Sequence, residues 1–385
     1  MDYSVGDFVE LITKKGVFRG YIMPKHEFSS DDILILKLEN GYNIGLKKSE
    51  IIEIKFIEHY ELKRKEISVK KNENGKKVTI LGTGGTIASY IDYKTGAVKP
   101  ALTPDELLFA VPEIGNKYNL ETKVLFNILS ENMKVEHWKV IAREIYNAFM
   151  DGSQGILIPH GTDTMAFTSA ALSFMLQDLP GPVVLVGAQR SSDRPSSDAH
   201  LNLLASFKLF DTDLGEVVVA MHGSISDTYV DVHRGVRVRK MHTSRRDAFK
   251  SINSEIIARI NENVKFLSDY KKRSGSLKLY DKMDESVALI YFYPNMDTDI
   301  LEYIGSRKKG IIIAGTGLGH VSSDTIKVLK DLIDSGVYVG ITSQCLYGSV
   351  NLNVYSTGRE MVKAGVRPLG DMLPEVAYVK LMWAM

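Results

Sequence analysis

Two short segments of the chain combine threonine, aspartate and glycine in a way that suits attack by a hydroxyl on a carbonyl. Thr86 lies in a glycine-rich stretch, residues 81–88, and Thr162 and Asp163 lie in a second stretch, residues 159–164. A hydroxyl is a weak nucleophile until a base, usually held by a third group, takes its proton. Lys240 is a candidate base, because a partly desolvated lysine beside a carboxylate can accept a proton near neutral pH. The residue types suggest a Thr-Lys-Asp site, and their spacing alone leaves that hypothesis open.

Both segments directly follow apolar runs that are typical of buried strands. The apolar runs are residues 78–81, 155–158, 183–186 and 217–220. Continuous apolar runs indicate strands buried on both faces, which predicts a parallel sheet flanked by helices from residue 76 to about residue 250. The expected helices are residues 103–110, 135–150 and 164–177. Ligands of such sheets bind beyond the carboxyl ends of the strands, which is where both segments lie.

The chain divides into a small barrel, a linker and two α/β domains. Residues 1–58 hold four or five short alternating runs separated by turn formers, which predicts a small β-barrel. Residues 59–75 carry more basic than acidic side chains and are expected to form a linker. A large α/β domain spans residues 76–284 and ends in a polar, irregular crossing at residues 253–284, and a smaller α/β domain spans residues 285–385. The expected strands of the smaller domain are residues 287–291, 310–314 and 337–341.

The composition excludes several classes of protein. The 385 residues carry 48 basic and 47 acidic side chains, so the net charge of +1 argues against a general nucleic-acid binder. The barrel segment is weakly acidic, which favours contact with protein over contact with RNA and leaves both open. A single cysteine excludes a disulfide framework and a zinc ribbon.

The ends of the chain and its hydropathy concern location. No run approaches the roughly 20 apolar residues that cross a bilayer, and the charged start does not resemble a signal peptide. We therefore expect a cytoplasmic protein without membrane contact. The last helix, expected from residue 373, stops at residue 385 without a capping residue, which suggests a shortened chain.

Other chemistries have less support. Ile87 stands where a dinucleotide-binding loop needs its third glycine, and no phosphate-binding P-loop pattern occurs. The histidines lack metal-ligand spacing, so no metal is expected, and His160 is expected to shape its loop. Cys345 is expected to be a buried thiol. Five arginines could equally contact a tRNA phosphate or form salt bridges between subunits: Arg234, Arg237, Arg239, Arg245 and Arg246.

Residues 83–88, TGGTIA, together with residues 160–164, HGTDT, closely resemble the two signature motifs of bacterial-type L-asparaginases and their amidase relatives. The resemblance covers residues 76–385 and implies an asparaginase-like fold of two α/β domains with parallel sheets and the active site between them. It implies that Thr86 is the nucleophile that attacks a side-chain carboxamide and expels ammonia. It also implies that Thr162, Asp163 and Lys240 form a second triad, which deprotonates a hydroxyl or the hydrolytic water.

The same resemblance implies roles for further residues. Tyr93 matches the tyrosine of a mobile loop that covers the nucleophile. Ser130 and Glu131 match residues that hold the α-carboxylate and α-amino groups of the substrate, although many relatives have glutamine in place of Glu131. Asp163 can also take the α-amino group. Gly85 and, from the smaller domain or a neighbouring subunit, Asn295 complete the expected substrate-binding set.

The residues before the glycine-rich stretch, residues 187–199 and the crossing at residues 253–284 resemble the glutaminase (D) subunits of archaeal Glu-tRNA(Gln) amidotransferases. This resemblance implies that the chain hydrolyses glutamine and passes ammonia to a GatE-type E subunit, which amidates Glu-tRNA(Gln). ATP and Mg²⁺ are expected only in that partner, Glu-tRNA(Gln) is expected to bind mainly through it, and no cofactor is expected in this chain. A homodimer core is expected from the resemblance alone. The alternatives are a free-standing L-asparaginase or glutaminase, and an inactive scaffold that binds RNA or protein through the barrel.

Overall fold

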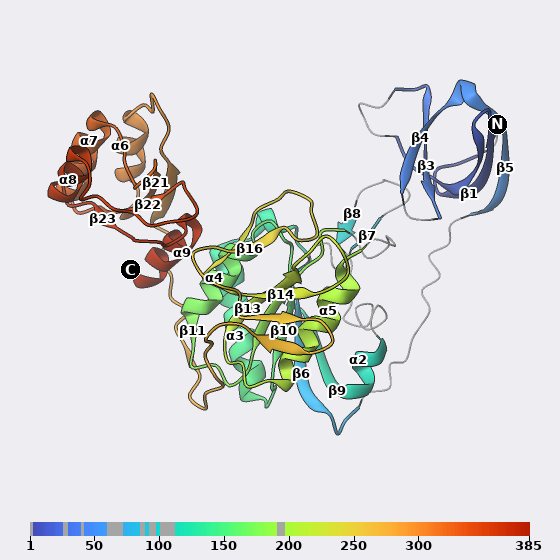
Figure 1. Ribbon diagram of the computed structural model, residues 1–385, viewed down its shortest axis with the longest axis horizontal. Helices are drawn as coiled ribbons and strands as arrows, with labels where there is room; N and C mark the ends of the chain where they lie inside the picture. Colours follow the sequence, from blue (N-terminus) through green and yellow to red (C-terminus); the bar gives the residue numbers. More distant parts are fainter. Residues whose placement is uncertain are drawn as a thin grey trace.

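The computed structural model describes residues 3–25, 30–39, 42–59, 72–84, 89–91, 98–100, 112–190 and 197–385. The expected helix at residues 103–110 and the candidate residues Gly85, Thr86 and Tyr93 lie outside these ranges. Figure 1 shows three groups of elements: an N-terminal antiparallel sheet, a large sheet with helices, and a smaller C-terminal sheet with helices.

The N-terminal sheet is antiparallel, in the order β4-β3-β2-β1-β5. Its strands are β1 (Asp7–Thr13), β2 (Gly16–Ile22), β3 (Ile33–Leu38), β4 (Asn43–Lys47) and β5 (Ile51–His59), with a 3₁₀ turn, η1 (Lys48–Glu50), before β5. Alternation along β1 buries Val9 and Leu11 in a core shared with Leu36, while Glu10 stays partly exposed. The predicted small barrel-like domain is confirmed.

The large sheet has eight strands in the order β18-β17-β14-β13-β12-β10-β6-β9. These are β6 (Lys76–Gly82), β9 (Tyr118–Val124), β10 (Ile156–Pro159), β12 (Val183–Val186), β13 (Val217–His222), β14 (Val230–Arg234), β17 (Ala258–Ile260) and β18 (Val264–Phe266). The strands from β9 to β13 pair in parallel, and β14, β17 and β18 extend the sheet in antiparallel fashion. The parallel sheet predicted from the four apolar runs is confirmed.

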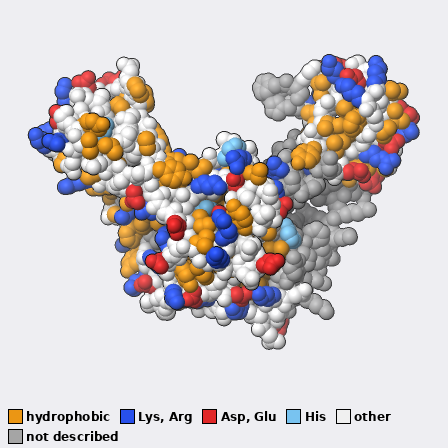
Figure 2. Space-filling view, in the orientation of Figure 1, with side chains coloured by type: hydrophobic (Ala, Val, Ile, Leu, Met, Phe, Trp, Pro, Cys, Tyr) orange, Lys and Arg blue, Asp and Glu red, His pale blue; other side chains and the backbone are white. Residues whose placement is uncertain are grey.

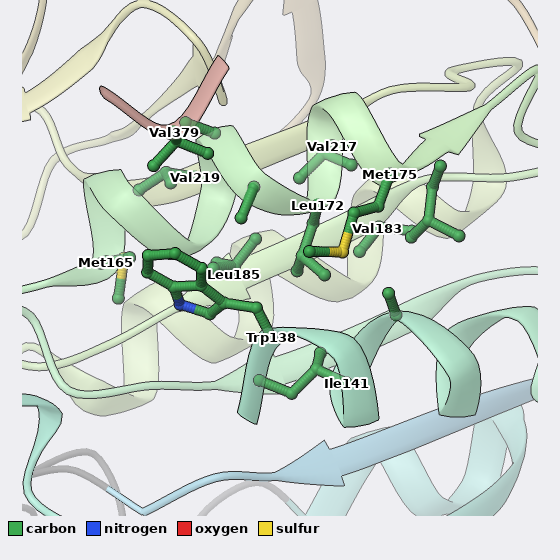
Figure 3. Close-up of a cluster of buried hydrophobic side chains, with 14 of the residues drawn as sticks. Trp138, Ile141, Met165, Leu172, Met175, Val183, Leu185, Val217, Val219 and Val379 are labelled. Carbon is green, nitrogen blue, oxygen red and sulfur yellow. The ribbon is translucent and has the colours of Figure 1, made fainter. Parts of the chain in front are cut away.

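Successive residues of the central strands face two different cores, which explains why their sequences are apolar throughout. Val183 and Leu185 enter a core with α3 (Val135–Met150) and α4 (Met165–Met175), whereas Val184 and Val186 face α5 (Ala199–Lys208) on the other side. Figure 3 shows the first core, where Trp138 and Leu172 point from the helices toward the strand side chains. Because side chains on both faces of these strands are buried, the strands are held in place, and so are their carboxyl ends, where the candidate motifs begin.

The helix predicted at residues 135–150 has those bounds in α3, whereas α4 ends two residues before its predicted limit of 177. The difference arises because β11 (Leu176–Gln177) pairs with β19 (Lys278–Leu279). Other short elements are β7 (Ser89–Ile91), β8 (Val98–Pro100), α2 (Pro112–Lys117), η3 (Ser130–Asn132), η4 (Leu209–Asp211), β15 (Val238–Lys240) and β16 (Phe249–Ser251).

The crossing at residues 253–284 is more regular than predicted. Its strands β17 and β18 extend the large sheet at one edge, and its strand β19 pairs with β11. The segment therefore does not form only an irregular excursion. Ile257, Ala258 and Ile260 are buried there. The prediction failed because strands of two or three residues are too short to show an alternating pattern.

The smaller domain has a parallel sheet in the order β20-β21-β22-β23. Its elements are β20 (Val287–Tyr291), α6 (Asp299–Gly305), β21 (Gly310–Gly315), α7 (Ser323–Asp334), β22 (Tyr338–Ser343), α8 (Ser356–Lys363), β23 (Arg367–Pro368) and α9 (Pro374–Ala384). The last helix, α9, packs against α4 of the large domain as well as against β20 and β21. This helix therefore joins the two α/β domains, whose predicted two-domain architecture is confirmed.

Candidate active site

The carboxyl ends of β6, β10 and β12 are held together by hydrogen bonds just where the candidate motifs begin. Thr83, after β6, donates from its backbone nitrogen and its hydroxyl to the carbonyl of Pro159, at 3.3 and 2.8 Å. His160, after β10, donates its backbone N–H to the carbonyl of Val186 at 2.9 Å. Thr83, in the glycine-rich stretch, and the HGTDT segment thus follow the carboxyl ends of two neighbouring strands, as the sequence predicted.

Thr162, Asp163 and Lys240 lie together at this edge. The ammonium of Lys240 donates to the hydroxyl of Thr162 at 2.9 Å and to Oδ1 of Asp163 at 2.7 Å. Thr162 is only 8% exposed, and the Lys240 side chain is 13% exposed, whereas 67% of the Asp163 side chain is exposed. The group therefore has a sheltered hydroxyl and ammonium beside a carboxylate that solvent or a ligand can reach.

Glycines on either side let the backbone approach Thr162. A Cβ on Gly161 would lie 2.6 Å from Cβ and 2.8 Å from Oγ of Ser130, and a Cβ on Gly187 would lie 2.8 Å from Cγ2 of Thr162. The hydroxyl of Thr164 donates to the carbonyl of Ser130 at 2.7 Å. Ser130 is thus locked beside the HGTDT segment by packing and by a hydrogen bond.

His160 anchors the same segment from inside the protein. Its imidazole is fully buried, with Nδ1 2.7 Å from the carbonyl of Gly161 and Nε2 2.9 Å from the hydroxyl of Thr168, which accepts the indole N–H of Trp138 at 3.0 Å. The carbonyl of Gly161 can only accept, so Nδ1 carries a proton, and in the neutral ring Nε2 then accepts from the hydroxyl of Thr168. Burial lowers the pKa of His160 to about 4, although the bond to Gly161 acts in the opposite direction. The ring therefore shapes the loop, as the sequence suggested.

The remaining candidates are placed less closely. Glu131 is exposed in η3, next to buried Ser130. Asn295 is exposed after β20 with a φ of 60°, and among the described residues no hydrogen bond or ion pair joins it to Lys240 or Asp163. Gly85, Thr86 and Tyr93 lie outside the described residues.

Each of the five arginines pairs with a carboxylate of this chain. The pairs are Arg234 with Glu216, Arg237 with Asp371, Arg239 with Glu375, Arg245 with Asp247, and Arg246 with Asp227. Contact with a tRNA phosphate and contact with a second subunit stay predictions. Figure 2 likewise shows basic and acidic side chains interspersed over the face it presents.

The prediction for Cys345 is wrong: its side chain is exposed. The residue follows β22, which ends at Ser343, so the chain has already left the core when it reaches the thiol. Within the described ranges, no cluster of three or more His, Cys, Asp or Glu residues could hold a metal ion. No helix of those ranges is long and apolar enough to cross a bilayer.

Sequence reasoning missed Gly187, Trp138 and Thr168. Gly187 could have been suspected, because it follows an apolar run directly, as the candidate motifs do. The hydrogen bond between Trp138 and Thr168 joins residues 30 positions apart, and no local pattern reveals it.

Models of known families match nearly the whole chain. Residues 77–272 match the N-terminal asparaginase domain, and residues 286–385 match the C-terminal domain of glutaminases and asparaginases. Residues 3–57 match the GatD N-terminal domain. The thermostable L-asparaginase from Thermococcus kodakarensis has a similar fold, with a TM-score of 0.73 and 34% identity over 80% of this chain and 92% of that one. The two α/β domains are therefore of the asparaginase class.

Curated relatives narrow this class. The chain is 54% identical to the D subunit of the glutamyl-tRNA(Gln) amidotransferase of Pyrococcus furiosus, over 99% of this chain and 90% of that protein. It is 53% identical to the corresponding D subunit of Sulfolobus acidocaldarius, over 99% of this chain and 87% of that protein. The chain belongs to the family of Glu-tRNA(Gln) amidotransferase D subunits, which confirms the resemblance found in its sequence.

Proposed function

We propose that this chain hydrolyses the side-chain amide of glutamine and supplies the ammonia for conversion of Glu-tRNA(Gln) to Gln-tRNA(Gln) by a partner subunit. The observation that carries the proposal is similarity to D subunits along the whole chain, including residues 3–57, which match a domain model named for those subunits. The asparaginase-class domains supply the amidohydrolase part of the proposal.

The chemistry begins with Thr86 as nucleophile. Its oxygen attacks the carboxamide carbon, and the amide NH2 group takes one proton and leaves as ammonia. Water then hydrolyses the glutamyl ester to glutamate and free threonine. Backbone N–H groups near Gly85 would stabilise the negative charge that develops on the carbonyl oxygen. Tyr93 would cover the nucleophile during the reaction.

Thr162, Asp163 and Lys240 would move the protons. In its neutral form Lys240 can accept the proton of the Thr162 hydroxyl across the 2.9 Å that separates them, and this hydroxyl can in turn take a proton from the nucleophile or water. Asp163, 2.7 Å from the ammonium, would orient Lys240 and could bind the α-amino group of glutamine with its exposed oxygen. Ser130, Glu131 and Asn295 would complete the binding of the α-substituents.

The assembly follows from the same proposal. An E-type partner would activate the glutamyl group of the tRNA with ATP and Mg²⁺, bind most of the tRNA, and receive ammonia from this chain in the cytoplasm. Residues 1–58 would serve as a separate barrel, with residues 59–75 as linker, and residues 76–284 and 285–385 as the two halves of the hydrolase. We expect the hydrolase core to form a homodimer.

The test is release of ammonia from glutamine by the purified chain, alone and with a candidate E subunit and Glu-tRNA(Gln). We expect ammonia release to rise when both are added, and Thr86→Ala or Thr162→Ala to lower turnover by about a thousandfold or more, because these hydroxyls act in the transition state. Thr228→Ala removes an exposed hydroxyl that bonds to the hydroxyl of Ser224 and is the matched control. If the wild type is no faster than the two site variants under every condition, the chain is a scaffold and the proposal is wrong.

A free-standing L-asparaginase is the second candidate, because solved structures similar to this chain include L-asparaginases. It predicts rapid hydrolysis of asparagine with no response to an E subunit or to charged tRNA. Assaying both amides under both conditions separates the candidates.

A further inference from the structure

Lys240 belongs to a strand, β15, that also contacts the smaller domain through its neighbour Arg239. Side chains of a strand alternate, so Lys240 and Val238 of β15 face one way and Arg239 faces the other. On the first face, Lys240 reaches Thr162 and Asp163. On the opposite face, the guanidinium of Arg239 lies 2.8 Å from Oε2 of Glu375 at the start of α9.

Two residues that flank the β15–β16 hairpin, one before β15 and one after β16, also contact the smaller domain. Arg237, just before the strand, contacts both carboxylate oxygens of Asp371, at 2.9 and 3.3 Å. The side-chain amide of Asn253 donates to the carbonyls of Leu346, Gly348 and Asp371 at 3.1, 3.1 and 3.2 Å, and its oxygen accepts the Gly348 N–H at 2.9 Å. Both chain segments at the open end of the β15–β16 hairpin are therefore bonded to the smaller domain.

The carboxylate of the ion pair between Arg239 and Glu375 is buried. The Glu375 side chain is only 5% exposed, and burial raises the pKa of this carboxyl even though Arg239 acts to lower it. A buried carboxylate needs a charged partner to remain ionised. Removing one member of a buried ion pair therefore lowers protein stability far more than removing one member of an exposed pair. The pair thus joins a half-buried guanidinium of β15 to a buried carboxylate of α9.

The apolar residues Val238 and Phe249 anchor the hairpin in the core beneath it, and Lys240 itself lies where the hairpin leaves that core. It is the last residue of β15, and the five residues that follow, 241–245, are exposed. Backbone pairing with β16 joins Lys240 to Phe249, but that hairpin is a two-stranded sheet separate from the large sheet. The ion pair of Arg239 with Glu375 therefore adds a polar contact directly beside Lys240, at the end of β15 where core packing gives way to exposed residues.

We propose that Arg239, through its ion pair with Glu375, is a positioning residue for Lys240, so that the smaller domain fixes the distance from this lysine to Thr162 and Asp163. The kinetic part of this inference rests on the proposed function, whereas the placement of Lys240 does not. Arg239 touches no reacting atom, and it acts only through the strand. A displacement of about 1 Å in a proton-transferring group can cost about a hundredfold in rate.

Kinetics provide the first readout. Arg239→Gln should lower kcat for glutamine about 10- to 100-fold, with a smaller change in KM, because proton transfer is impaired more than substrate binding. Arg239→Lys should restore most of the activity, since the contact to Glu375 is a single N–O pair that an ammonium can replace. Lys250→Gln, on β16 opposite Arg239 and partnered by Asp247, is the matched control and should behave as the wild type.

Acylation of lysines, followed by mass spectrometry of the full-length protein, provides a readout that needs no activity. We expect Lys240 to react faster in Arg239→Gln than in the wild type, because it leaves a site where only 13% of its side chain is exposed. Lys327, which is exposed on α7 far along the chain, should react at an unchanged rate and calibrates the reagent. Glu375→Gln breaks the same ion pair with little change of shape, and it should reproduce both effects if Arg239→Gln fails to fold.

The outcomes decide the inference separately from the proposed function. Faster acylation of Lys240 in the ion-pair variants, with rescue by Arg239→Lys, supports the positioning role even if the wild type hydrolyses no amide. Wild-type acylation of Lys240 in folded Arg239→Gln and Glu375→Gln overturns it. An equal loss of kcat in Lys250→Gln also overturns it, since the effect would then be a general weakening of the hairpin.

Discussion

Acid should loosen the HGTDT segment through the buried imidazole of His160. The ring is fully buried, so a proton added at Nε2 would create a charge that has lost the hydration it would have in water. Protonation of His160 therefore favours the unfolded state, in which the ring is solvated.

The size of this effect follows from the two pKa values of His160. The pKa is about 4 in the folded protein and 6.5 without the fold, so between these values the unfolded state binds more protons and stability rises with pH. The contribution is complete above pH 6.5 and is lost as the pH falls toward 4. Between pH 7 and pH 5 the loss is about 2 kcal/mol.

His160→Gln provides the comparison, because glutamine keeps a donor and an acceptor but does not titrate. Urea unfolding at a series of pH values can be followed by the fluorescence of Trp138, which bonds to Thr168 in the same network, in a Trp383→Phe background. His233, whose pKa burial lowers to about 3, is present in both proteins, so its contribution cancels in the difference.

We expect the wild type to lose about 2 kcal/mol more than His160→Gln between pH 7 and pH 5. Parallel stability profiles for the two proteins would refute the assignment of His160 as a buried neutral ring. A variant that loses more stability than the wild type on acidification would reverse the sign and refute it as well.

Two further substitutions test the packing behind the site. Gly161→Ala would drive a methyl group against Ser130, 2.6 Å from its Cβ, and should lower stability by about 1–3 kcal/mol and reduce activity, whereas Gly275→Ala, where nothing lies within 4 Å, should do neither. Leu172→Ala should lower the free energy of unfolding by about 2–5 kcal/mol in urea titrations, because Leu172 is fully buried between α4 and the sheet, while Leu267→Ala, at an exposed position, should change it little.

The central architecture was predictable because its physical cause is visible in short windows of sequence. Residues 183–186 are apolar throughout since both faces of β12 are covered, and α3 shows its buried stripe over the full predicted range. The HGTDT segment could be placed at the strand ends for the same reason, as it directly follows β10.

Features that depend on pairs of distant residues were not predictable in the same way. A guanidinium needs a carboxylate, but nothing near Arg239 in the sequence indicates Glu375, which lies 136 positions away. Cys345 was assigned to the interior because free cysteines are usually buried, and the end of β22 two residues earlier overrode that tendency. The short strands β17 and β18 gain their regularity from the sheet edge they join, so their own sequences carry little pattern.

The candidate triad itself combines both kinds of information. Thr162 and Asp163 sit on the rigid large sheet, on a segment that glycines and a buried histidine hold in one conformation. Lys240 arrives on a hairpin outside that sheet, 77 positions from Asp163, and its opposite face is bound to the smaller domain. The ion pair of Arg239 with Glu375 connects this hairpin to the smaller domain, so under the positioning role proposed above the junction between the two domains helps to set the geometry of the candidate triad.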